Sequence, residues 1–234
     1  MEHKEQPSYI NHRKRVKEKF LKDGFTEGTK EYEVLELVLF YCIPRVDTKE
    51  IAKDLLRKFG SLEWVFNAPA EELKKFPGIT DNGVVLLRLM IELTHICAAK
   101  SVNSKTVFSC VDEIGTYLLG RYAGITDERF AVVCLQNNGN FISFDFIGDG
   151  DKSSVGVSTR KIIEIVIEHK ATMIVIAHNH PGGLALPSGT DLETTKRISE
   201  ALKHIGVRLF DHIVIADGDF VSFAQSEQFR EYLK

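Results

Sequence analysis

The sequence has little cysteine, and the cysteines it has follow no metal or disulfide pattern. Four of them are scattered along 234 residues without paired spacing: Cys42, Cys97, Cys110 and Cys134. A cysteine-based zinc motif or a disulfide framework needs closer or more regular spacing, so neither is expected. We expect the four side chains to be buried as small apolar residues of a protein in a reducing compartment.

Long apolar runs and a large charge excess are also missing. No apolar run approaches the roughly 18 residues that a membrane span needs, and the N-terminus lacks a signal-peptide pattern. The net charge of −3 is no strong signature of binding to polyanions, although residues 12–17 are locally basic. We therefore expect a cytoplasmic protein without membrane contact. Apolar residues make up 44% of the chain, which is enough for a sizeable core.

Apolar residues at helical spacing dominate the first hundred residues. The pattern predicts helices at 13–21, 32–41, 49–59, 70–75 and 82–97, and a short one after Ser61. A polar, serine-containing stretch at 100–105 then predicts a linker. We expect an all-helical domain over residues 1–100 and a second domain over residues 104–234.

One segment of the helical domain has two interpretations. The turn Pro77-Gly78-Ile79 precedes a long helix, and residues 70–97 resemble a helix-hairpin-helix. In that module the turn directs backbone N–H groups and a helix N-terminus toward a nucleic-acid phosphate. The second glycine of the module is replaced here by Thr80-Asp81, and Asp81 would repel phosphate. The alternative is an αα-hairpin that only holds the domain together.

Strand and helix patterns alternate after the linker. Runs rich in β-branched and aromatic residues predict strands at 130–135, 141–147, 173–177, 209–216 and 220–223. Amphipathic patterns predict helices at about 110–119, 160–169 and 191–204. We expect this half to be a mixed α/β domain, which makes the whole chain an α+β protein.

Two histidines stand one residue apart at the end of the apolar run 173–177. Alternate side chains of a strand point to the same face, so His178 and His180 can address one target. Pro181 cannot donate a ladder hydrogen bond and should end the strand, and the two glycines that follow it allow a sharp turn. A helical zinc motif would instead place its histidines at positions i and i+4.

A carboxylate follows this turn. Ser188 is expected to cap the next helix, which puts Asp191 in the first turn and close to the two imidazoles. Two histidine nitrogens and one carboxylate oxygen form a ligand set for a catalytic zinc ion, with the fourth position left for water. The alternatives are that the histidines are surface residues and that Ser188 and Asp191 form only a capping box.

This arrangement resembles a known motif. His178-x-His180, seven residues, Ser188, two residues and Asp191 match the JAMM (MPN+) metalloprotease motif at every signature position. The wider stretch, about residues 104–226, resembles the bacterial RadC family, whose members generally carry a helix-hairpin-helix-like segment in front. The resemblance implies an all-helical domain followed by a mixed α/β, JAMM/MPN-like (cytidine-deaminase-like) metal-binding domain.

Two positions differ from the family pattern. Pro181-Gly182-Gly183 stands where the family usually has Pro-Ser-Gly, and Thr159-Arg160-Lys161 stands for Pro-Arg-Glu. Neither change touches a metal ligand. Arg160 could still orient a substrate. The pair Asp211-His212 recurs in RadC-like sequences and suits either a contact to a metal-bound histidine or a structural role at the start of a strand.

The resemblance also implies two catalytic residues. The general base of JAMM proteins is a glutamate at the start of an early strand, and Glu128, before the strand at 130–135, looks like that position. Asp127 is the near competitor, and an exposed carboxylate without a catalytic role is the alternative. The serine that matches Ser188 helps to stabilise the oxyanion in JAMM enzymes, and Ser188 can also cap its helix.

Two functions from different classes follow. The first is a zinc-dependent hydrolase of peptide or isopeptide bonds in a peptide or protein substrate, with three ligands, a base and an oxyanion helper: His178, His180, Asp191, Glu128 and Ser188. The second is a DNA-associated protein, in line with the DNA-repair label of RadC-like proteins, in which the helical domain binds DNA and the metal is structural or regulatory. A nuclease is a third option, but one zinc with this ligand set suits acyl-type hydrolysis better than two-metal phosphodiester cleavage.

Overall fold

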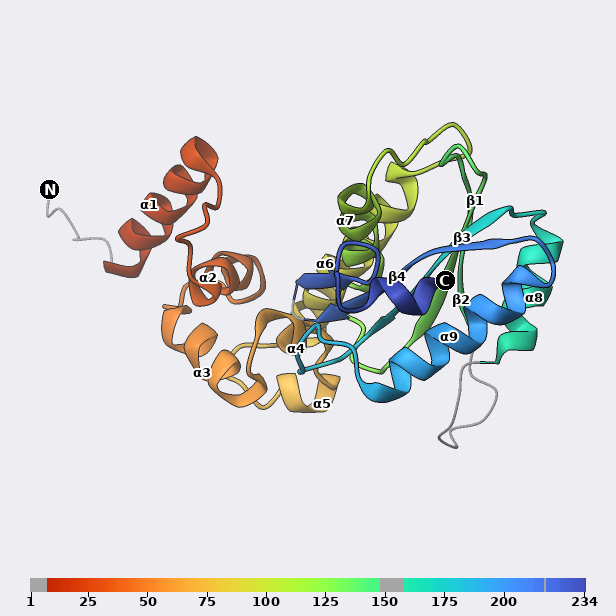
Figure 1. Ribbon diagram of the computed structural model, residues 1–234. Coiled ribbons are helices and arrows are strands. Elements are labelled where there is room, and N and C mark those ends of the chain that lie inside the picture. The colour runs from red at the N-terminus through yellow and green to blue at the C-terminus, as the bar shows by residue number, and fades with distance from the viewer. Residues whose placement is uncertain (1–7, 148–157, 217) are drawn as a thin grey trace, which may run out of the picture. The chain divides into compact units, whose positions relative to one another are not determined.

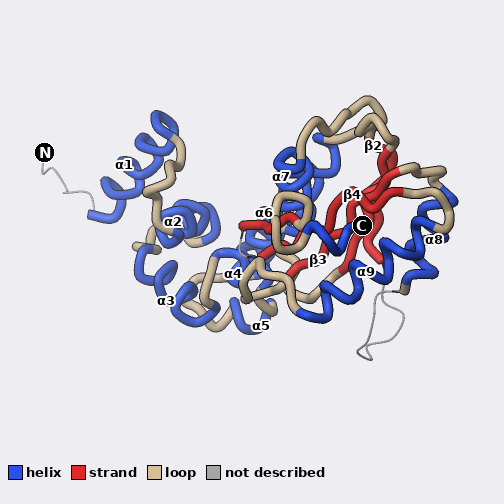
Figure 2. The backbone as a smooth tube through the Cα atoms, in the orientation of Figure 1, coloured by secondary structure: helices blue, strands red, loops and turns tan. Residues whose placement is uncertain are grey.

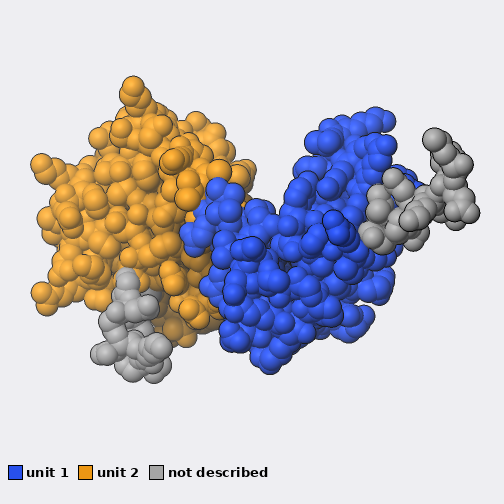
Figure 3. All heavy atoms as spheres, turned by 180° about the vertical axis from the view of Figure 1, so that it is seen from behind, with its two compact units in different colours: residues 1–93 blue, residues 94–234 orange. Residues whose placement is uncertain are grey.

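The computed structural model describes residues 8–147, 158–216 and 218–234. The chain forms two compact units, which Figure 3 colours separately: residues 1–93, here called the helical unit, and residues 94–234, here called the sheet unit. Each unit has a hydrophobic core of its own. Helices in the first half and a mixed sheet with helices in the second confirm the expected α+β class.

Within its described residues the helical unit consists of helices and short loops. The helices are α1 (Ser8–Asp23), α2 (Glu31–Cys42), α3 (Lys49–Phe59), α4 (Leu62–Asn67), α5 (Ala70–Leu73) and the first part of α6 (Asp81–Ser101), as Figure 1 shows. The sequence pattern predicts each of them. Their apolar faces build one core, in which the fully buried side chains include Leu35, Leu39, Leu55, Val65, Leu73 and Leu87.

Part of the basic segment 12–17 serves the packing of α1 on α2. Arg13 donates hydrogen bonds to the backbone oxygens of Phe40 and Ile43 near the C-terminal end of α2, where the last carbonyls of a helix need partners. His12 contacts the buried carboxylate of Glu36 at 2.8 Å. These two side chains are therefore committed to the fold of the helical unit.

The turn between α5 and α6 is shaped by packing. Gly78 adopts φ +81°, a region that side chains rarely enter, and a Cβ atom there would lie 2.6 Å from Cγ2 of Ile43. Ile79 is buried in the same core. The carboxylate of Asp81, in the first turn of α6, pairs with Lys74 at 2.5 Å. Packing thus explains the glycine, and the N-terminus of α6 carries a negative charge of its own.

Helix α6 runs from one unit into the other. The units divide after Leu93, inside this helix, whereas the sequence predicts the change of domain at residues 100–105. The last part of α6 packs closely against α7 (Val111–Tyr122), since a Cβ atom at Gly120 would lie 2.7 Å from Cβ of Ala98. The polar stretch that follows therefore connects elements of the same compact unit.

By length and composition, α6 is also the one helix in the described part of the chain that is long and apolar enough to cross a membrane. The expectation that no apolar run approaches this length does not hold for α6. Only Arg88 and Glu92 carry a charge between residues 82 and 99, which is why the helix meets this criterion. Val84 and Leu87 of the same helix are buried in the core of the helical unit.

The sheet unit is built on one mixed sheet. Its strands are β1 (Phe130–Leu135), β2 (Phe141–Ile147), β3 (Met173–Asn179), β4 (Arg208–Ala216) and β5 (Asp219–Ser222). They lie in the order β2-β1-β3-β4-β5, with β3 and β4 parallel and all other neighbours antiparallel. Helix α7 covers one face, and α8 (Thr159–Glu168) and α9 (Gly189–Lys203) cover the other (Figures 1 and 2). The sheet is thus the middle of three layers.

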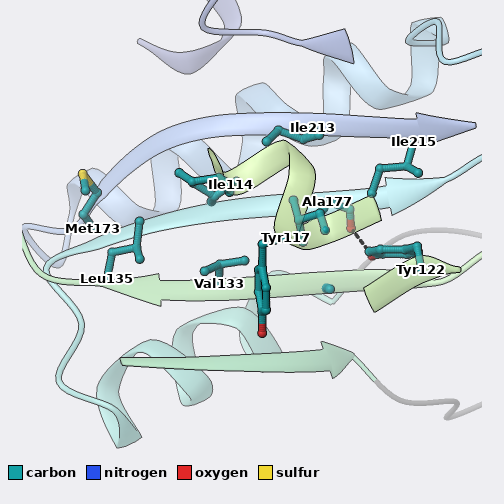
Figure 4. Packing of buried hydrophobic residues seen from close by; sticks show 12 residues of the cluster. Ile114, Tyr117, Tyr122, Val133, Leu135, Met173, Ala177, Ile213 and Ile215 are labelled. Carbon is teal, nitrogen blue, oxygen red and sulfur yellow. Dashed lines mark hydrogen bonds between the residues drawn. The ribbon is translucent and has the colours of Figure 1, made fainter. Parts of the chain in front are cut away.

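Apolar side chains fill the space between the sheet and α7. Figure 4 shows this cluster, whose labelled members come from α7, β1, β3 and β4: Ile114, Tyr117, Tyr122, Val133, Leu135, Met173, Ala177, Ile213 and Ile215. The hydroxyl of Tyr122 donates a hydrogen bond to the backbone oxygen of Ala177 at 3.0 Å, drawn as a dashed line in Figure 4. This bond ties α7 to the end of β3, immediately before the two histidines.

The cysteines only partly follow the expectation from the sequence. All four are free thiols. Cys134 is buried between the sheet and α8, and Cys42 is half-buried. Cys97 and Cys110 are exposed, so the prediction that all four are buried is wrong for these two. Cys97 belongs to the largely exposed last part of α6, and Cys110 is the residue that precedes α7.

Candidate metal centre

Strand β3 fixes the position of the two histidines. It is paired with β1 on one side and β4 on the other, and all its side chains are buried. His178 is only 2% exposed, whereas the side chain of His180, just after the strand, is 24% exposed. The chain then turns at Gly182, where φ is +67°. The strand continues two residues beyond the predicted 173–177.

Helix α9 supplies the carboxylate. The hydroxyl of Ser188 accepts a hydrogen bond from the backbone N–H of Asp191 at 3.3 Å and donates one to Oδ2 of Asp191 at 2.6 Å. The backbone N–H of Ser188 donates to the same oxygen at 2.7 Å, which completes a capping box. The capping box and the cluster with the histidines are therefore built from the same carboxylate and do not exclude each other.

The three side chains converge on one point. Nε2 of His178 lies 2.9 Å from Nε2 of His180 and 3.2 Å from Oδ1 of Asp191. Nε2 of His180 lies 3.6 Å from Oδ2 of Asp191. The ligand atoms of a tetrahedral zinc site, with bonds of about 2.0–2.1 Å, lie about 3.4 Å apart, so the spacing suits zinc. Among the described residues this is the one group of three such side chains that could hold a metal ion.

The chemistry of these groups also suits a cation. Nδ1 of His180 lies 3.1 Å from the backbone oxygen of Leu184, which can only accept, so Nδ1 carries the hydrogen and a neutral ring has its lone pair on Nε2. Burial raises the pKa of Asp191, but the neighbouring His178 and the hydrogen bonds from Ser188 outweigh burial and hold that pKa well below its usual range. An ionised carboxylate and an imidazole lone pair therefore face the same point.

A third histidine lies behind the first. Nε2 of His212 is 2.9 Å from Nδ1 of His178, and its fully buried ring stacks on Phe223 with 4.7 Å between the ring centroids. Phe210 is left without a partner in the pairing of β3 with β4. This bulge shifts the alternation of β4 by one residue and turns His212 to the face of the sheet that carries His178. His212 thus makes the contact that the sequence suggests for the Asp211-His212 pair.

Asp211 makes its side-chain hydrogen bonds to residues other than the candidate ligands. Its buried carboxylate accepts hydrogen bonds from the hydroxyl of Ser222 at 2.6 Å and from the backbone N–H of Ala224 at 2.9 Å. Burial raises the pKa of Asp211 to about 6, against the opposing effect of these hydrogen bonds. The side chain fastens the segment after β5 to β4.

Asn179, between the two histidines, faces the segment that precedes β1. Its side-chain oxygen accepts a hydrogen bond from the backbone N–H of Arg129 at 2.8 Å. Its amide group donates to the backbone oxygens of Ile125 at 3.2 Å and Asp127 at 3.1 Å. The end of the ligand-bearing strand therefore holds a loop that is about fifty residues away in the sequence.

Glu128, the predicted base, lies inside this held loop, and its side chain is exposed. It stands two residues before Phe130, which pairs with His178 across β1 and β3. Its role stays a prediction. Arg160 is engaged on α8 instead, where its Nε donates to the carboxylate of Glu164 at 3.0 Å.

The sequence also matches a known protein family. Residues 108–229, more than half of the chain, match the family described as RadC-like JAB domain. The chain belongs to the RadC family. One RadC-family relative, UPF0758 protein FN0909 of Fusobacterium nucleatum subsp. nucleatum, is 38% identical over 223 residues, which cover 92% of this chain and 95% of that protein. The similarity therefore extends through both units, and the resemblance recognised in the sequence is confirmed.

Sequence reasoning misses two residues of this RadC-family site. Asn179 is a polar residue next to His178 at the end of a strand that is apolar up to Ala177, and that is a signal for a buried hydrogen-bonding role. Thr195 lies one helical turn after Asp191 and is fully buried; its hydroxyl lies 2.6 Å from the backbone oxygen of Asp191 and 2.6 Å from Nδ1 of His212. Its position one turn after a candidate ligand is the signal that could have identified it.

Proposed function

We propose that this RadC-family protein is a zinc-dependent metallohydrolase of the JAMM type that cleaves peptide or isopeptide bonds. The observation that carries the proposal is the convergence of His178, His180 and Asp191 at a spacing that suits tetrahedral zinc. Membership of the RadC-like JAB domain family supports it.

Each residue of the site has a distinct task in this proposal. Zinc held by the three ligands would polarise the substrate carbonyl and acidify water. Glu128 accepts a proton from the attacking water and returns it to the nitrogen of the leaving amine. Ser188 turns its hydroxyl hydrogen from Asp191, where it donates now, toward the oxyanion.

The surroundings of the site favour a peptide or protein as the substrate. Two large apolar side chains of the loop between His180 and Ser188 are exposed, Leu184 at 73% and Leu186 at 57%. Leu184 is bound to His180 through its backbone oxygen, so this apolar surface adjoins a candidate ligand. An extended polypeptide offers both the amide bond and apolar side chains for such a surface.

A reducing compartment such as the cytoplasm fits the state of the cysteines. All four are free thiols, and two of them are exposed. We therefore place the proposed activity in the cytoplasm.

Substitution of Glu128 tests the proposed reaction. Purified protein is assayed on a panel of peptide and isopeptide-linked substrates, with zinc content measured in parallel by elemental mass spectrometry. Glu128→Gln should lower kcat about 10²- to 10⁴-fold, because the proton transfer is lost while the ligands remain. Asp127→Asn is the matched control and should retain both zinc and activity. Zinc-loaded wild-type protein that cleaves none of the panel, or an active Glu128→Gln, would contradict the proposal.

Binding of DNA by the α5–α6 hairpin is the alternative, and the hairpin offers less support for it. The N-terminus of α6 carries the carboxylate of Asp81, which pairs with Lys74 within the hairpin. Arg13 and His12 of the basic segment are engaged with α2. A DNA partner remains a prediction from the family resemblance.

A further inference from the structure

The candidate ligand His178 is backed by a hydrogen-bonded chain that returns to the helix of another ligand. Nδ1 of His178 lies 2.9 Å from Nε2 of His212, and Nδ1 of His212 lies 2.6 Å from the hydroxyl oxygen of Thr195. That hydroxyl lies 2.6 Å from the backbone oxygen of Asp191. Thr195 and His212 are both fully buried, so water does not compete for these contacts.

The number of available hydrogens fixes the direction of this chain. Two oxygens 2.6 Å apart need a hydrogen between them, and the backbone carbonyl of Asp191 has none, so the single hydroxyl hydrogen of Thr195 lies there. The contact between Thr195 and Nδ1 of His212 then needs a hydrogen from the ring. Because His212 uses its hydrogen at Nδ1, its Nε2 accepts, and the hydrogen in the next contact belongs to Nδ1 of His178.

We propose that Thr195 and His212 are positioning residues that hold His178 with its hydrogen on Nδ1, so that the Nε2 lone pair faces the metal. The other candidate histidine needs no such device, because Nδ1 of His180 faces a backbone oxygen that can only accept. A histidine contact behind His178 is ambiguous by itself, since either imidazole could donate. Thr195 removes the ambiguity. The inference rests on the proposed metal site for its purpose.

The environment of His212 supports this assignment. The ring of His212 is fully buried, and a charge without a partner is costly in such a place, so the ring is neutral and has one hydrogen to place. The rings of Phe130 and Phe223 lie against it at 5.9 and 4.7 Å between centroids, which restricts its rotation. Thr195 and Asp191 lie one turn apart on α9. The same helix therefore supplies one candidate ligand, Asp191, and through Thr195 orients another, His178.

A matched pair of substitutions tests the role of the hydroxyl. Thr195→Val keeps the volume of the side chain and removes the hydroxyl, whereas Thr195→Ser keeps the hydroxyl. Zinc affinity is measured by competition with a chromophoric chelator, and folding is checked by circular dichroism. We expect Thr195→Val to bind zinc about 10-fold more weakly, the lower end of the loss seen when the direct partner of a ligating histidine is removed, because Thr195 acts on His178 through His212. Thr195→Ser should stay within a few-fold of wild type. A folded Thr195→Val with wild-type affinity would overturn the proposal.

A direct measurement on the wild-type protein needs no substitution at Thr195. Nitrogen-15 NMR of protein labelled at histidine reports which ring nitrogen carries hydrogen, and His212→Gln identifies the signals of residue 212. At alkaline pH we expect His212 to carry its hydrogen on Nδ1 with or without zinc. We expect the same of His178 in the zinc-loaded protein. A hydrogen on Nε2 of His212 would overturn the inference even if Thr195→Val failed to fold.

The outcomes separate this inference from the proposed hydrolase function. If zinc binds and depends on Thr195 but no peptide or isopeptide is cleaved, the positioning role stands and the hydrolase proposal fails. If peptides are cleaved and Thr195→Val binds zinc normally, the positioning role fails alone. Wild-type protein that binds no zinc would overturn both.

Discussion

The helical unit and the sheet unit differ in where they bury polar side chains. Among the described residues, the buried polar side chains of the helical unit are Glu36 and Thr48, whereas the sheet unit buries His178, Asn179, Thr194, Thr195, Ser199, Asp211, His212 and Ser222. Burial of a polar group costs free energy unless it is hydrogen-bonded. Three of these groups in the sheet unit, His178, Thr195 and His212, are connected to one another at the candidate metal centre.

The bonding of these groups sharpens the contrast. In the helical unit, Thr48 donates to the backbone oxygen of Glu36, and Glu36 meets His12, so polar groups fasten one helix to the next. In the sheet unit, His212 and Asn179 connect to the candidate ligands or to the loop of the predicted base. The charged groups of the α5–α6 hairpin, by contrast, are exposed and pair with each other. The comparison predicts that substitutions in the two units have different consequences.

The largest expected effect is on metal content. His178→Ala or Asp191→Ala each removes one of three ligands, so zinc content should fall from about one per chain to none in elemental analysis. Lys74→Ala, in the hairpin of the helical unit, should leave zinc content unchanged. A folded wild-type protein that stays free of metal after incubation with zinc would show that the sheet unit holds no zinc site, and the predicted difference between the two units would fail.

The next effect concerns Asp211 and pH. Its pKa in the folded protein, about 6, lies above the ordinary value of 3.8, so the folded state binds the proton more tightly than the unfolded state. The free energy of unfolding should therefore fall by about 3 kcal/mol from this group as pH rises from about 4 to about 6, and level off above. Asp211→Asn should lack this fall. Urea unfolding of both proteins across that range measures the difference, and parallel curves would contradict it.

A smaller effect is expected for two asparagines, one in each unit. Asn179→Ala leaves one backbone donor and two backbone acceptors near Arg129 without their partners, and should lower the free energy of unfolding by about 2 kcal/mol. Asn67→Ala, which removes a single bond from its amide to the backbone oxygen of Glu63 on α4, should cost about 0.5 kcal/mol. Denaturant titration compares the two, and equal costs would weaken the contrast.

The smallest effect is expected in the hairpin. Asp81→Asn removes an exposed pair with Lys74, and pairs of this kind contribute little to stability because solvent screens them. Thermal unfolding should therefore change little. If the hairpin binds DNA, loss of this negative charge should tighten binding to a duplex oligonucleotide in fluorescence anisotropy, with Lys74→Ala showing the opposite effect. No binding by any of the three proteins would leave the hairpin a purely structural element.

Local patterns in the sequence account for the predicted part of the site. The spacing of His178 and His180 and the capping box at Ser188 each depend on a few neighbouring residues, and the structure brings these features together. The roles of Asn179 and His212 depend on pairing across the sheet, at sequence separations of about 50 and 34 residues. The face on which His212 lies depends on a bulge that no local pattern indicates.

The ends of the helices show the same difference between features that depend on neighbouring residues and features that depend on distant ones. Helix α3 begins and ends as its amphipathic pattern predicts, because Gly60 ends it locally. Helix α6 continues past the predicted residue 97 to Ser101, where the contact between Ala98 and Gly120 keeps it ordered. That contact joins residues far apart in the sequence and cannot be inferred from the helical pattern alone.

Because of the bulge at Phe210, the number of residues in β4 decides which face of the sheet His212 occupies. Side chains alternate along a strand, so the one extra residue decides whether His212 lies with the ligands or among the apolar side chains under α7. Removal of one residue there would leave every amino acid of the motif present and still carry the histidine to the opposite layer. A relative can thus keep the letters Asp-His at this place and lack the contact, so alignment gaps in β4 are as informative about the site as substitutions.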